Sequence, residues 1–111
     1  MPDPERTGGI MITEIAQIDI KAGMEAEFEA GVAKARAAFQ QSKGFHGFEL
    51  HRSIEKPQRY RLVVKWATLE NHTVDFRNSE NFTQWRGCVS HCFASPPEVE
   101  HTATVLAAPA A

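Results

Sequence analysis

The sequence predicts an α+β fold in which helices cover one face of a four-stranded antiparallel sheet. Four segments alternate apolar and polar residues with the period of a β-strand, and two others repeat apolar residues every three or four positions, as amphipathic helices do. The segments follow one another as strand, helix, strand, strand, helix, strand. This βαββαβ order is typical of the ferredoxin-like arrangement, with both helical regions on the same side of the sheet.

The first half of the chain supplies a strand and a helix. Residues 10–20 place apolar side chains at even positions and polar ones at several positions between, and only Glu14 breaks the apolar face. Residues 24–39 show the apolar spacing of an amphipathic helix, with acidic residues in the first turn and Lys43-Gly44 after its end.

A hairpin follows this helix. Phe48, Leu50 and Ile54 alternate with polar residues, and the turn EKPQ separates them from a second strand. The apolar face of that second strand consists of Tyr60, Leu62, Val64 and Trp66.

The last third predicts a bent helical region and a final strand. Thr68 can cap a helix whose apolar stripe contains Leu69, His72, Thr73 and Phe76. Asn78-Ser79 offers a second cap, so we expect the helix to break there and continue through Phe82, Trp85, Val89, Cys92 and Phe93. After Pro96-Pro97, the last strand places on one face Val99, His101, Ala103 and Val105.

The bulk composition indicates one small domain. The chain has 111 residues, of which 42% are apolar, and we expect a folded body at 10–106 between tails at 1–9 and 107–111. The net charge of −2 comes from interspersed charges, so nucleic acid is not an expected partner. No apolar run is long enough to span a membrane and the N-terminus lacks a signal-peptide core, so we expect a cytoplasmic protein.

The two cysteines predict neither a disulfide nor a metal site. Cys88 and Cys92 lie four residues apart on an expected helix, where the backbone disfavours a disulfide. His91 points away from that cysteine face, and three ligands would be an incomplete set for zinc, so buried free thiols are the favoured interpretation.

The sheet face away from the helices mixes apolar and polar residues. Ile15, Phe45 and Val63 are expected there among threonine, glutamine, arginine and lysine side chains. Such a face is too apolar to stay open to water, and a homodimer that packs sheet against sheet would cover it.

One segment carries a resemblance to a known family. VVKWATLENHTVDFRNSENFTQWR combines a strand that ends in tryptophan, an acidic helix start, a histidine and the spacing Phe-x-x-Ser-x-x-Phe-x-x-Trp. With the late strand, this pattern resembles the antibiotic biosynthesis monooxygenase domain over about residues 10–106. The resemblance implies a dimeric α+β barrel with a pocket between each sheet and its helices.

The haem-degrading branch of that family matches poorly. When Ser79 and Phe82 are aligned with it, its asparagine, tryptophan and histidine positions hold Ala16, Phe76 and Arg86. Arginine does not ligate iron, so ordinary haem degradation is not the favoured expectation, although another histidine could take the axial position.

A second branch oxidises anthrones and related quinols without a metal or flavin. Trp66 and Arg86 match its tryptophan and arginine, His72 stands at its tyrosine position, and Leu62 replaces its asparagine. The resemblance therefore implies a cofactor-independent monooxygenase that uses dioxygen on a small planar phenolic, quinol or anthrone-like compound.

Three residues are the expected catalytic groups. A neutral histidine accepts a proton near pH 7, so His72 is the predicted base, with Asp75 placed to orient its ring. Arg86 would stabilise the oxygen anion, and Trp66 would form a wall for a planar substrate. Each has a structural alternative: a core histidine, an arginine paired with Glu80 or Asp75, and a core tryptophan.

Four further residues are expected to contact the substrate: Phe76, Leu62, His101 and Trp85. His101 would extend a histidine pair into the pocket or else face the dimer interface. The inward carboxylate of Glu14 needs a partner, and Arg52 is the predicted one. His46, His51 and His91 are expected to be exposed.

Two other functions remain open from the sequence. The chain could be a non-catalytic module that binds a small apolar molecule or dimerises. It could also bind haem through His72, His91 or His101.

Overall fold

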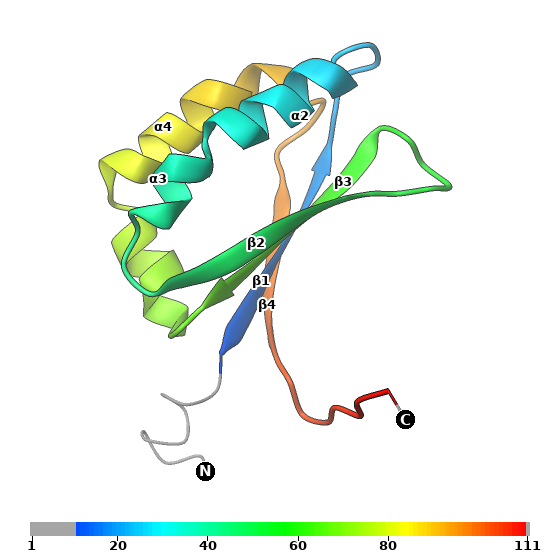
Figure 1. Cartoon of the computed structure of the whole chain (residues 1–111). Coiled ribbons are helices and arrows are strands. Elements are labelled where there is room, and N and C mark those ends of the chain that lie inside the picture. The colour runs from blue at the N-terminus through cyan, green and yellow to red at the C-terminus, as the bar shows by residue number, and fades with distance from the viewer. Residues whose placement is uncertain (1–10, 111) are drawn as a thin grey trace.

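The computed structural model describes residues 11–110 and has the predicted order of elements. Four strands, β1 (Ile12–Asp19), β2 (Phe45–Arg52), β3 (Arg59–Trp66) and β4 (Glu98–Ala103), form an antiparallel sheet in the order β2-β3-β1-β4. Figure 1 shows the helices together on one face of this sheet. The predicted ferredoxin-like α+β fold is confirmed.

Two short helices form the first helical region where the sequence predicts one. α2 (Glu25–Lys34) and α3 (Arg36–Gln40) are separated at Ala35, whose amide donates to both the Gly31 and Val32 carbonyls. The break lets the helical path follow the twisted sheet, and Phe28, Val32 and Phe39 all reach the core.

The second helical region is divided as predicted. A π-helical turn, η1 (Asn71–Phe76), precedes α4 (Glu80–Val89), and a short 3₁₀ turn, η2 (Ser90–Cys92), follows it. The Ser79 hydroxyl accepts from the Phe82 amide and so caps α4. The predicted break at Asn78-Ser79 is therefore confirmed.

The core lies between the sheet and the helices, because even-numbered residues of β1 and β3 point toward the helices. Ile18, Leu62, Val64 and Trp66 are each at most 1% exposed. Glu14 lies among them, opposite Val64 on β3 and His101 on β4, so the one polar interruption predicted on this face is present.

Phe45 does not lie on the outer sheet face as predicted. A β-bulge between Phe45 and Phe48, where Gly47 has φ +122°, turns both rings toward Phe39. Ile54 also departs from its predicted position, since β2 ends at Arg52 and Ile54 is 90% exposed in the following loop.

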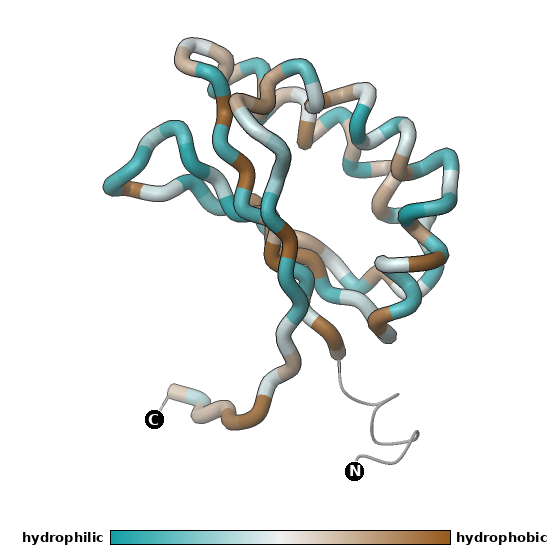
Figure 2. Tube along the Cα trace, turned by 180° about the vertical axis from the view of Figure 1, so that it is seen from behind, coloured by the Kyte–Doolittle hydropathy of each residue, from teal (hydrophilic) through white to brown (hydrophobic). Residues whose placement is uncertain are grey.

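The chain after β4 runs away from the sheet (Figure 1). The predicted last strand is too long, because β4 ends at Ala103 and Val105 is exposed. Seen from behind, apolar and polar residues alternate along the strands (Figure 2). The predicted N-terminal tail, residues 1–9, lies outside the described residues.

No helix in residues 11–110 is long and apolar enough to cross a membrane. Cys88 and Cys92 are free thiols, as predicted, and Cys92 is buried. His46, His51 and His91 are exposed.

Candidate active site

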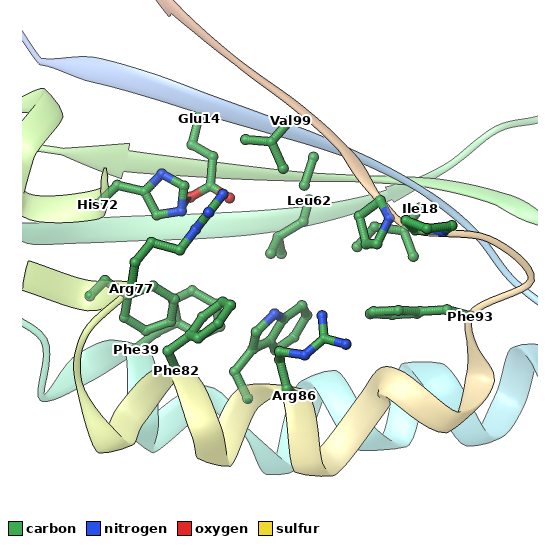
Figure 3. A pocket seen from close by; sticks show the side chains of 15 residues that line it. Glu14, Ile18, Phe39, Leu62, His72, Arg77, Phe82, Arg86, Phe93 and Val99 are labelled. Atoms are coloured by element: carbon green, nitrogen blue, oxygen red, sulfur yellow. Dashed lines mark ion pairs between the residues drawn. The ribbon is translucent and has the colours of Figure 1, made fainter. Parts of the chain in front are cut away.

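A cavity of about 260 Å³ lies between the inner face of the sheet and α4. Its apolar lining includes Leu62 and Val99 from the sheet and Phe76, Phe82 and Trp85 from the helical side. Its polar lining consists of Glu14, His72, Arg77 and Arg86. Figure 3 shows Glu14 and His72 at the sheet side and both arginines extending from the helical side.

Glu14 is held at this wall by two neighbours. The Trp66 indole N–H donates to Glu14 Oε1 at 2.9 Å, and His72 Nε2 lies 3.3 Å from the same oxygen. Glu14 is only 5% exposed, and burial raises the pKa of its carboxyl to about 7. The Trp66 hydrogen bond and the positive charge of Arg77 oppose this rise, because both favour the ionised form.

The π-helical turn places His72 beside Glu14. At its start, Thr68 N donates to Asn71 Oδ1 and Asn71 N donates to Thr68 Oγ1, which confirms the predicted cap at Thr68 and makes it reciprocal. The wider π turn brings Asn71, His72 and Phe76 to the buried side. The predicted stripe is therefore wrong for Leu69 and Thr73, which are exposed.

His72 has partners at both ring nitrogens. Nδ1 lies 2.8 Å from His101 Nε2, and Nε2 faces Glu14. Burial, followed by the nearby charges of Arg77 and His101, lowers the pKa of His72 to about 4, so its ring is neutral near pH 7. The predicted orienting role of Asp75 is wrong, because Asp75 accepts a hydrogen bond from Asn71 Nδ2.

Two arginines complete the polar lining of the cavity: Arg77 extends toward Glu14 and His72, and Arg86 projects from α4 farther along (Figure 3). The guanidinium of Arg86 lies 5.7 Å from the centre of the Phe93 ring, and that of Arg77 lies 5.6 Å from the Phe82 ring. Within residues 11–110, no carboxylate forms a salt bridge with either one. The predicted alternative, a pair between Arg86 and Glu80 or Asp75, is therefore not observed in that part of the chain.

Comparisons with known proteins agree with this architecture. The family model described as antibiotic biosynthesis monooxygenase matches residues 11–104. The chain belongs to the antibiotic biosynthesis monooxygenase family.

Relatives of this family member include proteins of several descriptions. A solved structure of a candidate antibiotic biosynthesis monooxygenase from Bordetella bronchiseptica is 58% identical, with a TM-score of 0.86, and the match covers 87% of this chain and 99% of that one. The uncharacterized protein YczJ of Bacillus subtilis is 35% identical over 91 residues, which are 82% of this chain and 96% of YczJ. A mycobilin-producing heme oxygenase of Mycobacterium tuberculosis is 34% identical over 59 residues, 53% of this chain and 56% of that protein.

A more distant structure has the same fold. SnoaB, a cofactor-independent oxygenase from Streptomyces nogalater, aligns with a TM-score of 0.73 over 90% of this chain and 98% of its own. At 17% identity, this likeness concerns the fold alone.

In this family member the predicted site residues fall into two groups. His72, Arg86, Leu62, Phe76 and Trp85 line the cavity. Trp66 and His101 do not line it, and their contact with a substrate stays a prediction. Trp66 is completely buried and donates to Glu14, whereas His101 lies behind His72.

The sequence reasoning missed Arg77 and the role of Glu14. Arg77 follows the π turn, whose irregular spacing hides it from a helical pattern. The position of Glu14 on an apolar strand face did indicate a buried carboxylate that needs a partner. The predicted partner, Arg52, was wrong. Arg52 instead donates to the Pro57 carbonyl and lies 3.8 Å from Glu29.

Away from the cavity, Glu27, His91 and Cys92 place potential metal-ligand atoms within 4.8 Å of one another. This trio differs from the cysteine and histidine set considered from the sequence. Burial raises the pKa of the Cys92 thiol, which disfavours the thiolate that a metal would need.

Proposed function

We propose that this protein is a cofactor-independent monooxygenase that uses dioxygen on a small planar phenolic, quinol or anthrone-like compound. One observation carries the proposal: an apolar cavity with the buried Glu14–His72 couple on one wall, the Arg77 guanidinium extending toward that couple, and the Arg86 guanidinium on the helical side. This is the arrangement that deprotonation of a phenol and storage of the resulting negative charge require.

The volume of the cavity limits the size of the substrate that it can hold. At about 260 Å³ it falls just below the roughly 300–1,000 Å³ of typical drug-sized ligand sites. Its aromatic lining, with Phe76, Phe82 and Trp85, suits a planar ring. We therefore propose that one- and two-ring phenols are better substrates than three-ring anthrones.

The proposed reaction balances without a cofactor. A phenol with a free para position reacts with one dioxygen to give a para-quinone and water. The Glu14–His72 couple takes the phenol proton, the phenolate transfers an electron to dioxygen, and the two radicals join through a new carbon–oxygen bond. Loss of the ring C–H proton and cleavage of the O–O bond then leave the carbonyl and release water.

Arg86 is proposed to stabilise the oxygen anion formed on the way. Its guanidinium stays charged at all relevant pH values and lines the cavity without a carboxylate partner in residues 11–110. Arg77, which extends toward Glu14 and His72, offers a second cationic group at the cavity wall.

The test is oxygen consumption by the full chain with a panel of phenols, hydroquinones, naphthols and anthrones. We expect turnover of at least one compound and a loss of about a hundredfold in kcat for Arg86→Gln. Arg36→Gln, at an exposed position of α3, is the matched control and should keep wild-type activity. If no compound raises oxygen uptake above the protein-free rate, the oxygenase proposal is wrong.

The same panel separates the other functions. Binding without turnover would support a non-catalytic module. Haem binding would give a Soret band with hemin, but the geometry does not favour it. Both His72 nitrogens are engaged, His101 does not line the cavity, and His91 contacts Glu27 on the surface.

We also propose that the protein is a homodimer in which the outer sheet faces meet. Ile15 and Val63 are register partners in the centre of that face and are only partly buried within one chain. Packing of a second copy would remove their remaining apolar surface from water.

A further inference from the structure

Glu14, rather than His72, has the free proton-accepting atom in the cavity. An imidazole ring has two nitrogens, and those of His72 face Glu14 Oε1 at 3.3 Å and His101 Nε2 at 2.8 Å. Nδ1 is therefore hydrogen-bonded to His101, and Nε2 points at the Glu14 carboxylate rather than at open cavity.

The two oxygens of Glu14 have different surroundings. Oε1 accepts from the Trp66 indole and faces His72, whereas Oε2 takes part in no hydrogen bond within residues 11–110. Every buried side-chain nitrogen or oxygen in that part of the chain has a hydrogen-bond partner. Oε2 is therefore not sealed in the core, and since Glu14 lines the cavity, Oε2 is the oxygen open to it.

The groups around Glu14 favour one arrangement of protons. The Trp66 indole is a donor only, so Oε1 is an acceptor. The His72 tautomer with its N–H at Nε2 points that N–H toward Oε1, 3.3 Å away, and leaves Nδ1 to accept from His101. A donor at His101 would thereby fix this tautomer of His72, and the His72 ring packs against the carboxylate with its Nε2 toward Oε1.

The ionisation behaviour agrees with this geometry. Burial raises the pKa of Glu14 to about 7, near the value that suits a base at neutral pH, and lowers that of His72 to about 4, which makes the imidazole a weak base. The charged or titratable groups that face Glu14 are His72 from η1, His101 from β4 and Arg77 after η1.

We propose that Glu14 is the catalytic base of this site, that its Oε2 takes the phenol proton, and that His72 and His101 are positioning residues. This assignment rests on the oxygenase proposal for the reaction, but the acceptance of a proton at Glu14 does not need turnover. It reverses the role that the sequence suggests for His72.

The proton transfers balance over one turnover. The Glu14 carboxylate takes the phenol O–H proton, and after the carbon–oxygen bond has formed, it returns that proton to the distal oxygen of the peroxide anion. The carboxylate then removes the ring C–H proton while the O–O bond breaks and hydroxide leaves. Transfer of the proton from Glu14 to hydroxide gives water and restores the carboxylate.

The first experiment compares Glu14→Gln with Glu49→Gln, the same carboxylate-to-amide change at an exposed residue of β2. With any turned-over phenol, we expect kcat to fall at least a hundredfold in Glu14→Gln and to stay unchanged in Glu49→Gln. If Glu14→Gln keeps more than a tenth of the wild-type kcat, the assignment is overturned and the oxygenase proposal stands.

The second experiment measures proton transfer without turnover. The full chain is titrated with 4-nitrophenol, whose ionised form absorbs visible light, across a range of pH on both sides of neutrality. Because Glu14 and the bound phenol share one proton, we expect the anion signal to rise with pH in two separate steps in wild type and in a single step in Glu14→Gln. An equal anion signal in both proteins, or no binding to wild type, would overturn the assignment. Glu14-dependent ionisation without turnover of any phenol would instead refute only the oxygenase proposal.

The positioning role of His72 has a separate readout in the pH dependence of the nitrophenol anion signal. An N–H directed at a carboxylate favours its ionised form, so loss of the His72 N–H in His72→Phe should shift the profile to higher pH. His72→Gln retains an N–H donor and should stay closer to the wild-type profile. If both variants leave the profile unchanged in folded protein, His72 does not position Glu14.

Discussion

Glu14 and His72 lie 3.3 Å apart in one buried site, yet burial shifts their pKa values in opposite directions. Each shift follows from the cost of placing a charge away from water: the acid is kept neutral by a raised pKa and the imidazole by a lowered one. The pair therefore avoids two buried charges at pH values where both groups would be ionised in an unfolded chain. The two pKa shifts also make folding stability depend on pH, and replacing one of the two residues should expose the contribution of the other.

The predicted effect of Glu14→Gln is a new pH dependence of stability between about pH 4 and 6.5. In wild type, the raised pKa of Glu14 makes stability fall as pH rises from 4.5 to about 7, while the lowered pKa of His72 makes it rise from about 4 to 6.5. These slopes oppose each other.

Without the Glu14 carboxyl, the His72 slope remains, and His101, whose pKa is also lowered by burial, adds to it in the same direction. The free energy of unfolding of Glu14→Gln should therefore rise by about 3 kcal/mol over this range, measured by urea denaturation. Parallel pH profiles for wild type and Glu14→Gln would contradict this prediction.

The element that organises the site is the π-helical turn η1 together with its reciprocal cap. Asn71 is 5% exposed, accepts from the Thr68 amide and donates to Asp75, and its side chain lies directly over Gly44 before β2. A Cβ at Gly44 would stand 2.0 Å from Asn71 Oδ1, and Gly44 has φ +76°. Glycine at this position therefore lets the cap form and, through it, places His72.

The predicted effect of Gly44→Ala is a loss of about 1–3 kcal/mol of stability, from backbone strain and the displaced Asn71 side chain. Because the cap positions η1, oxygen consumption should fall as well. Gly87→Ala is the matched control: it lies in α4 with no other heavy atom within 4 Å of the added Cβ, and it should gain roughly 0.5–1 kcal/mol. Urea denaturation measures both, and equal stability of the two variants would refute the proposed role of Gly44.

The whole molecule buries one sheet face under its helices and leaves the other partly apolar. The inner face encloses the cavity, whereas the outer face carries Ile15 and Val63 between polar neighbours. The bulge at Gly47 removes Phe45 from the outer face, so that face is less apolar than the sequence pattern indicates.

The predicted dimer can be tested by substitution at the outer face. Val63→Glu places a charge at its centre and should convert the dimer to a monomer, because burying an unpaired carboxylate is unfavourable. Ile54→Glu, in the exposed loop after β2, is the control and should leave the mass unchanged. Light scattering after gel filtration measures the mass, and a monomeric wild-type protein would contradict the dimer.

The sequence by itself determined the order of elements, the ferredoxin-like topology, the helix break at Ser79 and the inward position of Glu14. These features follow from local periodicity and caps, whose physical causes lie within a few neighbouring residues. The prediction that His72 and Arg86 share a site also follows, because both lie on helical segments over the same sheet.

Only the tertiary structure decided which groups meet. Glu14 contacts Trp66 and His72, not Arg52. The pairing of β1 with β3 brings Trp66 close to Glu14, and the π turn brings His72 there. Arg77 joins the cavity, and His101 is placed behind His72, through the same long-range packing. Periodicity states which way a side chain points, but the distance between groups far apart in the chain depends on strand pairing and helix packing, and that distance decides which of them can exchange a proton.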